Sequence, residues 1–409
     1  MKVKPVVIII PVLIALLGFL TGSSLLWQLF IFSVLILGLG YLWLIVNTRG
    51  IEVKVKDLPE HSRVGDRFEE EIIVTNNSIL PKSGLRVRGV SDLPGYEDSV
   101  FLDLSPEESH TWKSKIDCLR RGLYTLGTVN VTASDPLGLI TLNRISGEAR
   151  KLLVFPETLV LPFFEPETYV GTDYGMGQLL RSETSSTIGQ VREYASGDTL
   201  NHVHWPSTAH MGTLMVKVFE NDQMRYQSRN VWIVLNMRRE DHVLSLEVST
   251  EDYAVTIASS LLNKYLDAGK ETGLLMAGDR RYVFTPGFDD EFRFRADEAL
   301  ARIQAAGKEP VSHLISEETD RFDRDSVIII ITPSIEEDLI TNVHTLRNRG
   351  CLVVVILLDS ASFGGRTLNL KTARDLSLAG SQVYIIKKGD DIARILDSRH
   401  VSSPLMYGE

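Results

Sequence analysis

Acidic and imidazole side chains that could bind a metal ion or transfer protons are concentrated in one short stretch, residues 187–220. Asp198, His202, His204 and His210 all fall inside it. Because strand residues two positions apart face the same side, His202 and His204 would point together if this part of the chain is extended. With Asp198 and His210 they would offer the nitrogen and oxygen ligands that transition metals take. The pattern therefore allows a metal-dependent or hydrolytic enzyme.

The same stretch also has a structural interpretation. Asp198 would then cap the loop or pair with Arg192, and Trp205 would pack against the sheet and support it. A Ser-His-Asp arrangement with Ser196 or Ser207 is a further chemical alternative. No Gly-rich phosphate loop of the Walker type occurs, so we expect no nucleotide hydrolysis by this chain. We favour the structural interpretation and expect no catalytic residue, no metal and no cofactor.

Two runs with strand-like alternation enclose this polar segment. They cover residues 188–194 and 214–219, and Gly197-Asp198 provides turn residues between them. The stretch is therefore predicted to form a strand, a loop rich in aromatic and histidine residues, and a second strand.

The residue pattern of this stretch resembles a known family signature. The run V-R-E-Y-x-x-G-D-x-x-x-x-V-x-W-x-x-x-A, followed by L-x-V-K-x-F-E, is similar to the signature of the domain of unknown function 58 family. Two positions differ, because Asn201 and His210 stand where the family usually has arginine. The matched positions are Val191, Arg192, Glu193, Tyr194, Gly197, Asp198, Val203, Trp205, Ala209, Leu214, Val216, Lys217, Phe219 and Glu220.

The resemblance implies an architecture and a partner, since the family has no established activity. Relatives tend to accompany MoxR-type AAA+ ATPases, so such an ATPase is the expected partner. The family does not require histidine at positions 202 and 210, which weakens a metal role for this stretch. Residues expected to form or brace the docking surface are Arg192, Tyr194, Gly197, Asp198, His204, Trp205 and Lys217.

Composition restricts the possible classes of protein. The chain has 409 residues, enough for two or three domains, and a formal net charge of −10 without a large basic block. This balance argues against a general nucleic-acid binder. Cys118 and Cys351 are far apart in the sequence and indicate no disulfide framework, which is compatible with a reducing compartment.

The N-terminal 49 residues are predicted to form a transmembrane hairpin. No charged residue occurs between positions 5 and 46, and residues 21–24 supply a turn between two apolar halves. Residues 25–46 are long enough to span a bilayer, whereas the first half is short. Lysines precede the first half, and Arg49 and Lys54 follow the second, so the positive-inside rule places both ends in the cytoplasm. A cleaved signal peptide followed by one helix is the alternative.

Residues 50–155 are predicted to form an immunoglobulin-like β-sandwich. About seven short alternating runs are separated by turn residues, among them Asn76-Asn77-Ser78 and Asp135-Pro136-Leu137-Gly138. Residues 156–186 are rich in Pro, Gly, Thr and Ser and are expected to be a linker along the surface. The signature region then covers residues 187–228.

Residues 229–409 are predicted to form a doubly wound α/β domain. Apolar strands are expected at 230–235, 273–277, 327–332, 351–358 and 383–386, with a strand at 281–285 beside the second. Helices are expected from about residue 250 and at 292–306, 335–349, 371–379 and 391–396. This alternation indicates a parallel sheet covered by helices. The family resemblance implies that the domain is similar to the von Willebrand factor A fold.

That fold often binds a divalent cation through D-x-S-x-S after its first strand, because hard cations prefer carboxylate and hydroxyl oxygens. Here the corresponding residues run from Asn236 to Glu240, with Arg238 and Arg239 between them. No carboxylate leads and no serine follows, so we expect the metal site at Asn236 and Arg238 to be degenerate.

The sequence therefore predicts a non-enzymatic, membrane-anchored scaffold or adaptor whose soluble domains are cytoplasmic. The alternative from another class is a membrane-tethered hydrolase or metal-dependent enzyme using Asp198, His202 and His204. A third is an envelope structural protein with its soluble part outside.

Overall fold

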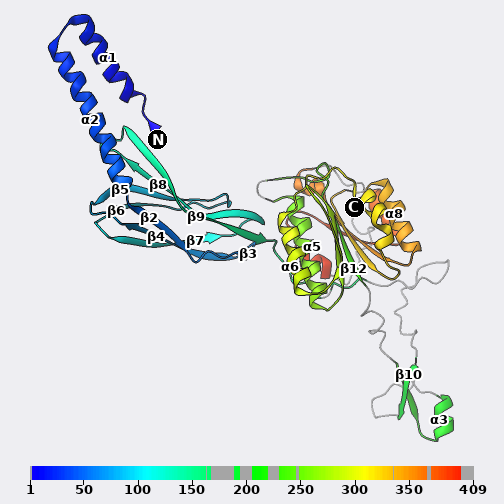
Figure 1. Cartoon of the computed structure of the whole chain (residues 1–409). Helices are drawn as coiled ribbons and strands as arrows, with labels where there is room; N and C mark the ends of the chain where they lie inside the picture. The colour runs from blue at the N-terminus through cyan, green and yellow to red at the C-terminus, as the bar shows by residue number, and fades with distance from the viewer. Residues whose placement is uncertain are drawn as a thin grey trace. The chain divides into compact units, whose positions relative to one another are not determined.

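The structure is a computed structural model, shown in Figure 1. It describes residues 2–162, 164–166, 188–193, 205–219, 230–245, 248–334, 336–365 and 370–397. These form two compact units: Met1–Glu157 with Asp297–Arg302, and Thr158–Ala296 with Ile303–Glu409.

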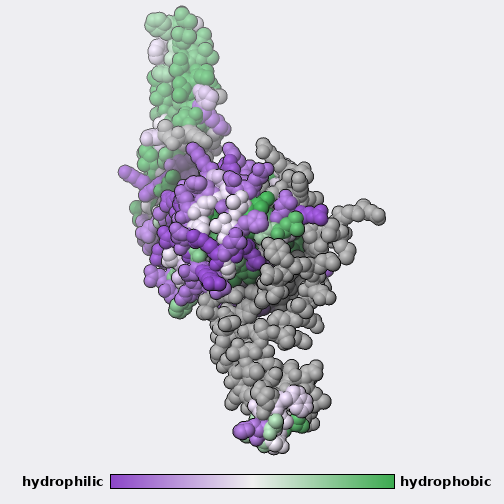
Figure 2. Space-filling view, turned by 90° about the vertical axis from the view of Figure 1, so that its right-hand side faces the viewer, coloured by the Kyte–Doolittle hydropathy of each residue, from purple (hydrophilic) through white to green (hydrophobic). Residues whose placement is uncertain are grey.

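Two apolar helices open the chain, α1 (Val6–Thr21) and α2 (Ser24–Thr48). Gly22, with φ of 67°, ends α1 in a left-handed cap, which glycine adopts without steric cost. Gly18 brings the helices close, since a Cβ there would lie 3.3 Å from Cβ of Leu26. In the described part of the chain, only α2 is long and apolar enough to cross a membrane, with a mean hydropathy of 2.6. Figure 2 shows that the surface of this helical pair is mostly apolar.

Eight strands follow and form a β-sandwich, as the alternating pattern predicts. One sheet has the order β1-β9-β8-β5-β6, in which β1 is Lys2–Val3 and β3 lies beside β9, and the other has the order β2-β4-β7. Inward residues alternate with outward residues, so Leu85, Val87, Ile72 and Val74 reach a common core. The strands are β2 (Ile51–Lys56), β3 (His61–Arg63), β4 (Arg67–Asn76), β5 (Lys82–Val90), β6 (Ser99–Leu104), β7 (Ser109–Asp117), β8 (Gly122–Ser134) and β9 (Ile140–Phe155).

The last two strands are longer than the short strands that the sequence indicates. They pair on both sides of a β-bulge, where the register shifts between Leu126 and Thr128. Gly127 lies in this bulge with φ of 84°, and Gly147, with φ of 95°, pairs with Thr128. A Cβ on Gly127 would approach the Glu148 carbonyl oxygen to 2.4 Å, so only glycine fits.

The end of α2 is fixed into the sandwich. Leu44 is buried in the same core as the sheet residues. The Asn47 amide donates to the Ser83 carbonyl at 2.8 Å, and the Ser83 backbone N–H donates to Asn47 Oδ1 at 3.0 Å. The buried Lys82 ammonium donates to the Val46 carbonyl, in the last turn of the helix where a positive charge is favourable.

The second unit contains a six-stranded sheet with the order β14-β13-β12-β15-β16-β17. β14 is antiparallel to its neighbour, and the other five strands are parallel. The central strands are buried on both faces, which is why they are continuously apolar in sequence. The strands are β12 (Val231–Asn236), β13 (Thr272–Ala277), β14 (Arg281–Gly287), β15 (Val327–Thr332), β16 (Leu352–Leu358) and β17 (Gln382–Ile386).

Helices cover both faces of this sheet, with α5 and α6 on one side and α8 on the other (Figure 1). The five predicted apolar strands are confirmed within one residue of their observed ends, and the strand predicted at 281–285 extends two residues further, to Gly287. One helix, α7, was not predicted, because its sequence Val-Ser-His-Leu-Ile-Ser-Glu-Glu is short and follows Pro310. The helices are α5 (Thr250–Asp267), α6 (Asp290–Arg302), α7 (Val311–Glu318), α8 (Glu337–Asn348), α9 (Leu370–Leu378) and α10 (Ile392–Asp397), with short 3₁₀ turns at η2 (Thr319–Arg321) and η3 (Ser360–Phe363).

Candidate functional site

The signature stretch contains two antiparallel strands, as predicted. β10 (Ile188–Glu193) pairs with β11 (Met215–Phe219), and Arg192 lies opposite Val216 while Val191 lies opposite Lys217. Of the predicted site residues, Tyr194, Gly197, Asp198, Asn201, His202 and His204 lie outside the described residues. Their suggested metal or docking roles therefore remain predictions.

The segment between the strands contains a helix, α3 (Trp205–Met211), where the sequence indicated a loop. The Met215 backbone N–H donates to Thr208 Oγ1 at 3.0 Å, which ties α3 to the start of β11. Trp205 is 67% exposed, so the expectation that this ring packs against the sheet is wrong. Met211 and Leu214 are exposed as well. An exposed apolar surface at a tryptophan is typical of a protein-binding site.

The second candidate site lies at the carboxyl ends of β12 and β15, the point where the strand order reverses. Ligands of open α/β sheets bind in this position. Asn236 is 2% exposed, and its amide donates to Asp241 at 3.0 Å and to Thr332 Oγ1 at 2.9 Å. Its Oδ1 accepts the Arg238 backbone N–H at 3.0 Å. The Asn236 side-chain oxygen that could face a ligand therefore accepts a hydrogen bond from the chain itself.

Arg238 places a fixed positive charge at this edge of the sheet. Its guanidinium lies 2.9 Å from Glu336 and 2.7 Å from Glu240. Glu336 also accepts a hydrogen bond from Ser312 Oγ at 2.7 Å. A divalent cation would meet a guanidinium and an amide nitrogen here, so the residues do not fit a metal of the von Willebrand type.

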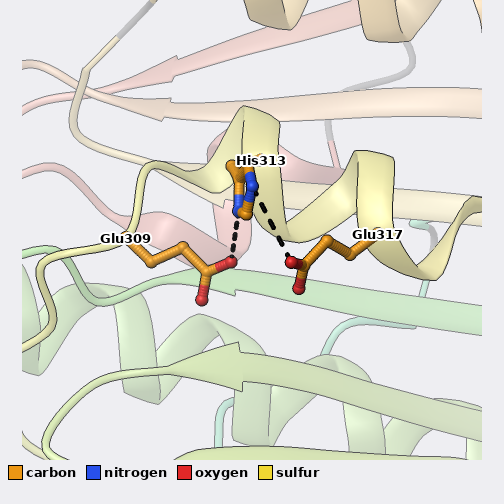
Figure 3. Close-up of side chains that lie close together, drawn as sticks. All are labelled: Glu309, His313 and Glu317. Atoms are coloured by element: carbon orange, nitrogen blue, oxygen red, sulfur yellow. Dashed lines mark hydrogen bonds and ion pairs between the residues drawn. The ribbon is translucent and has the colours of Figure 1, made fainter.

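A third group of polar side chains was missed by the sequence analysis. Glu309, His313 and Glu317 lie at and just before α7, with their ligand atoms within 4.8 Å of one another (Figure 3). Their spacing of four residues places them on one face of a helix, which is the signal that could have identified them. They lie on or beside a shallow groove of about 720 Å³ that includes Ser312 and Asn342.

The geometry of this group indicates an ion-pair network. The Nδ1 of His313 is 2.7 Å from Glu309, while its Nε2 is 3.7 Å from Glu317. Each carboxylate therefore meets a different ring nitrogen of His313, as in an ion-pair network. The hydrogen bond to Glu309 and the charge of Glu317 raise the pKa of His313. Arg281 lies 2.5 Å from Glu317 and lowers the pKa of that carboxyl.

Comparison with known proteins supports the resemblance to the signature. A family model described as "Protein of unknown function DUF58" matches residues 190–363, from β10 to the 3₁₀ turn after β16. The chain is also 23% identical over 252 residues to the uncharacterized protein YeaD of Bacillus subtilis. That alignment covers 61% of this chain and 60% of the relative, so a large part of the relative lies outside the similarity.

Solved structures give weaker similarities. BatB of Bacteroides thetaiotaomicron is 15% identical, with a TM-score of 0.33 over 42% of this chain and 96% of that chain. A CARDB domain of a Pyrococcus furiosus protein is 18% identical, with a TM-score of 0.21 over 25% of this chain and 94% of that one. Similarities at this level carry no argument about function.

Proposed function

We propose that this chain is a membrane-anchored scaffold that binds a MoxR-type AAA+ ATPase through the surface formed by Trp205, Met211 and Leu214. The observation that carries the proposal is the exposure of Trp205, at 67%, within the stretch that has the family signature. A large aromatic side chain held out in water costs free energy unless it is covered by a partner. The family resemblance supplies the identity of the partner.

Membrane anchoring is supported by α2 and by the start of the chain. β1 (Lys2–Val3) pairs with β9 of the sandwich, to which α2 also returns. Both ends of the helical pair are therefore on the sandwich side, as expected for two passes. Lysine and arginine at these ends favour the cytoplasmic side by the positive-inside rule. The sandwich and the α/β unit would then share the compartment of the ATPase.

The α/β unit fits the scaffold role as a domain of the von Willebrand factor A type. Support for this fold comes from the strand order and from the single antiparallel edge strand β14. At its switch point, Arg238 and Asn236 are engaged within the chain. The domain would act through surface contacts and without a bound metal.

The experiment that tests the function is crosslinking in the native membrane with wild type, Trp205→Ala and Phe288→Ala. Phe288 is a matched control, because it is 64% exposed and lies away from the signature stretch in sequence. We expect wild type and Phe288→Ala to capture a MoxR-type ATPase. Trp205→Ala should reduce capture by roughly 30-fold, the loss expected for an interface hot spot of about 2 kcal/mol.

Equal capture by both variants would contradict the docking surface, and capture of no ATPase by wild type would contradict the partner. Stoichiometric zinc in the purified protein, lost in His202→Ala/His204→Ala, would instead support a metal-dependent enzyme.

A further inference from the structure

The turn between β8 and β9, residues 135–139, lies beside the apolar helices. A Cβ on Gly40 of α2 would be 3.7 Å from Cβ of Asp135, so helix and turn are in close contact. The Lys4 backbone N–H donates to the Leu139 carbonyl at 3.1 Å. Figure 1 shows the hairpin running alongside the lower part of α2 toward the N-terminus.

The turn is built so that it holds one leucine outward. The Asp135 side chain is buried and accepts hydrogen bonds from the backbone N–H groups of Ile140 at 2.6 Å and Leu137 at 3.2 Å. Gly138, with φ of 64°, donates its N–H to the Asp135 carbonyl at 2.8 Å. Leu137 remains 63% exposed at the tip. A fixed turn that exposes a large apolar side chain to water is unfavourable unless another apolar phase covers it.

Aromatic residues on α2 indicate where the bilayer surface lies. Trp27 is exposed near one end of α2, and Tyr41 and Trp43 are exposed near the other. Tyrosine and tryptophan are enriched at membrane–water interfaces. At a rise of 1.5 Å per residue the two groups are about 21–24 Å apart, close to the length of α1. Gly40, which contacts the turn, is therefore at the level of the interface next to the sandwich.

We propose that the tip of the β8–β9 hairpin is a further membrane contact, in which Leu137 enters the boundary between headgroups and acyl chains. The occupant of this surface is the lipid bilayer, and the turn is continuous with the apolar surface of α2. The contact rests on the proposed membrane anchoring of the helices. Together with the fixed end of α2, it would hold the sandwich in one orientation to the membrane.

The test uses the full chain in phosphatidylcholine–phosphatidylglycerol vesicles, with an environment-sensitive dye on Leu137→Cys or on Leu119→Cys. Leu119 is the matched control, since it is 58% exposed and precedes the opposite end of β8. Both native cysteines are buried, so the folded wild type controls for background labelling. Lipids with a doxyl quencher near the headgroup report the depth of the dye.

The proposal predicts blue-shifted emission and strong quenching for the dye at position 137, and neither for the dye at position 119. If the two dyes behave alike while the protein stays in carbonate-washed vesicles, the hairpin contact is overturned and the anchoring by helices stands. Release of the protein by carbonate would overturn both the contact and the anchoring.

Discussion

Arg238 shows how a single residue determines what the edge of the α/β sheet can bind. Its guanidinium joins Glu336 and Glu240, and Glu336 is held in addition by Ser312. Since Arg238 is 27% exposed and Glu336 22%, the pair is shielded in part from water. Removing one member leaves the other charge without its partner, which costs more than losing a surface ion pair.

We therefore expect Arg238→Ala to lower the free energy of unfolding by about 1–3 kcal/mol in denaturant titrations. The exposed neighbour Arg239 is the control, and Arg239→Ala should change this energy by less than about 0.5 kcal/mol. Similar losses for the two variants would show that the Arg238–Glu336 contact is not formed in solution.

The position of Arg238 leads to a prediction about how divalent cations affect thermal stability. Because the guanidinium and the Asn236 amide occupy the switch point, millimolar Mg²⁺ or Mn²⁺ should leave the melting temperature of the α/β unit unchanged. A ligand that binds the folded state would raise it by mass action. A cation-dependent increase that disappears in Asn236→Ala would contradict this account of the site.

His313 gives the protein a pH-dependent interaction. Its pKa is raised by the hydrogen bond to Glu309 and by the charge of Glu317, so the folded state binds the proton more tightly than the unfolded state. The stabilisation is complete below the unfolded value of about 6.5 and is lost as pH rises through the folded pKa. Wild type should therefore melt above His313→Gln at acidic pH, and the difference should shrink at alkaline pH.

The pKa of His313, measured by NMR, should fall in Glu309→Gln because the strongest hydrogen-bond acceptor is then neutral. An unchanged pKa in this variant would mean that the Glu309 contact is not responsible.

At the scale of elements, the joint between α2 and the sandwich fixes the end of this helix on the first unit. The reciprocal hydrogen bonds of Asn47 with Ser83 and the Lys82 contact to Val46 fix the last turn of the helix. This joint fixes the orientation of α2 relative to the sandwich, since no flexible linker separates α2 from β2.

Asn47→Ala removes both hydrogen bonds between the buried Asn47 side chain and the Ser83 backbone. We expect a loss of about 1–3 kcal/mol in stability and faster amide exchange in the last turn of α2. Asn143→Ala, on the exposed part of β9, is the matched control and should leave both unchanged. Unchanged exchange in Asn47→Ala would argue for a loose joint.

The buried parallel strands were predictable, because burial on both faces leaves an uninterrupted apolar run such as Val327–Thr332. Helix α7 and its Glu309–His313–Glu317 face were not, since a helix of this length has little periodicity to detect. The Asn47–Ser83 joint depends on two residues that only the tertiary fold brings together, and no local pattern reports such a pair.

For the signature stretch, alternation identified β10 and β11 correctly, while α3 was missed. Its sequence begins Trp-Pro-Ser-Thr, where proline and β-branched residues favour a loop in isolation. The outward position of Trp205 was missed as well, because an aromatic residue near a strand is usually expected to be buried.

For the whole molecule, the proposed scaffold function depends on the side of the membrane on which the soluble units lie. An ATPase requires cytoplasmic nucleotide, so the scaffold function holds only if the sandwich and the α/β unit are cytoplasmic. The β1–β9 pairing puts both ends of the helical pair on the sandwich side. The cytoplasmic side is part of the proposed function and rests on the basic residues at these ends.

The most direct measurement is thiol labelling of intact cells with a membrane-impermeant reagent. Because Cys118 and Cys351 are buried, the reporters are Ser23→Cys in the turn between α1 and α2 and Leu119→Cys in the sandwich. The account predicts labelling of Ser23→Cys in intact cells and labelling of Leu119→Cys only after permeabilisation. Labelling of Leu119→Cys in intact cells would place the soluble units outside and would contradict a scaffold for a cytoplasmic ATPase.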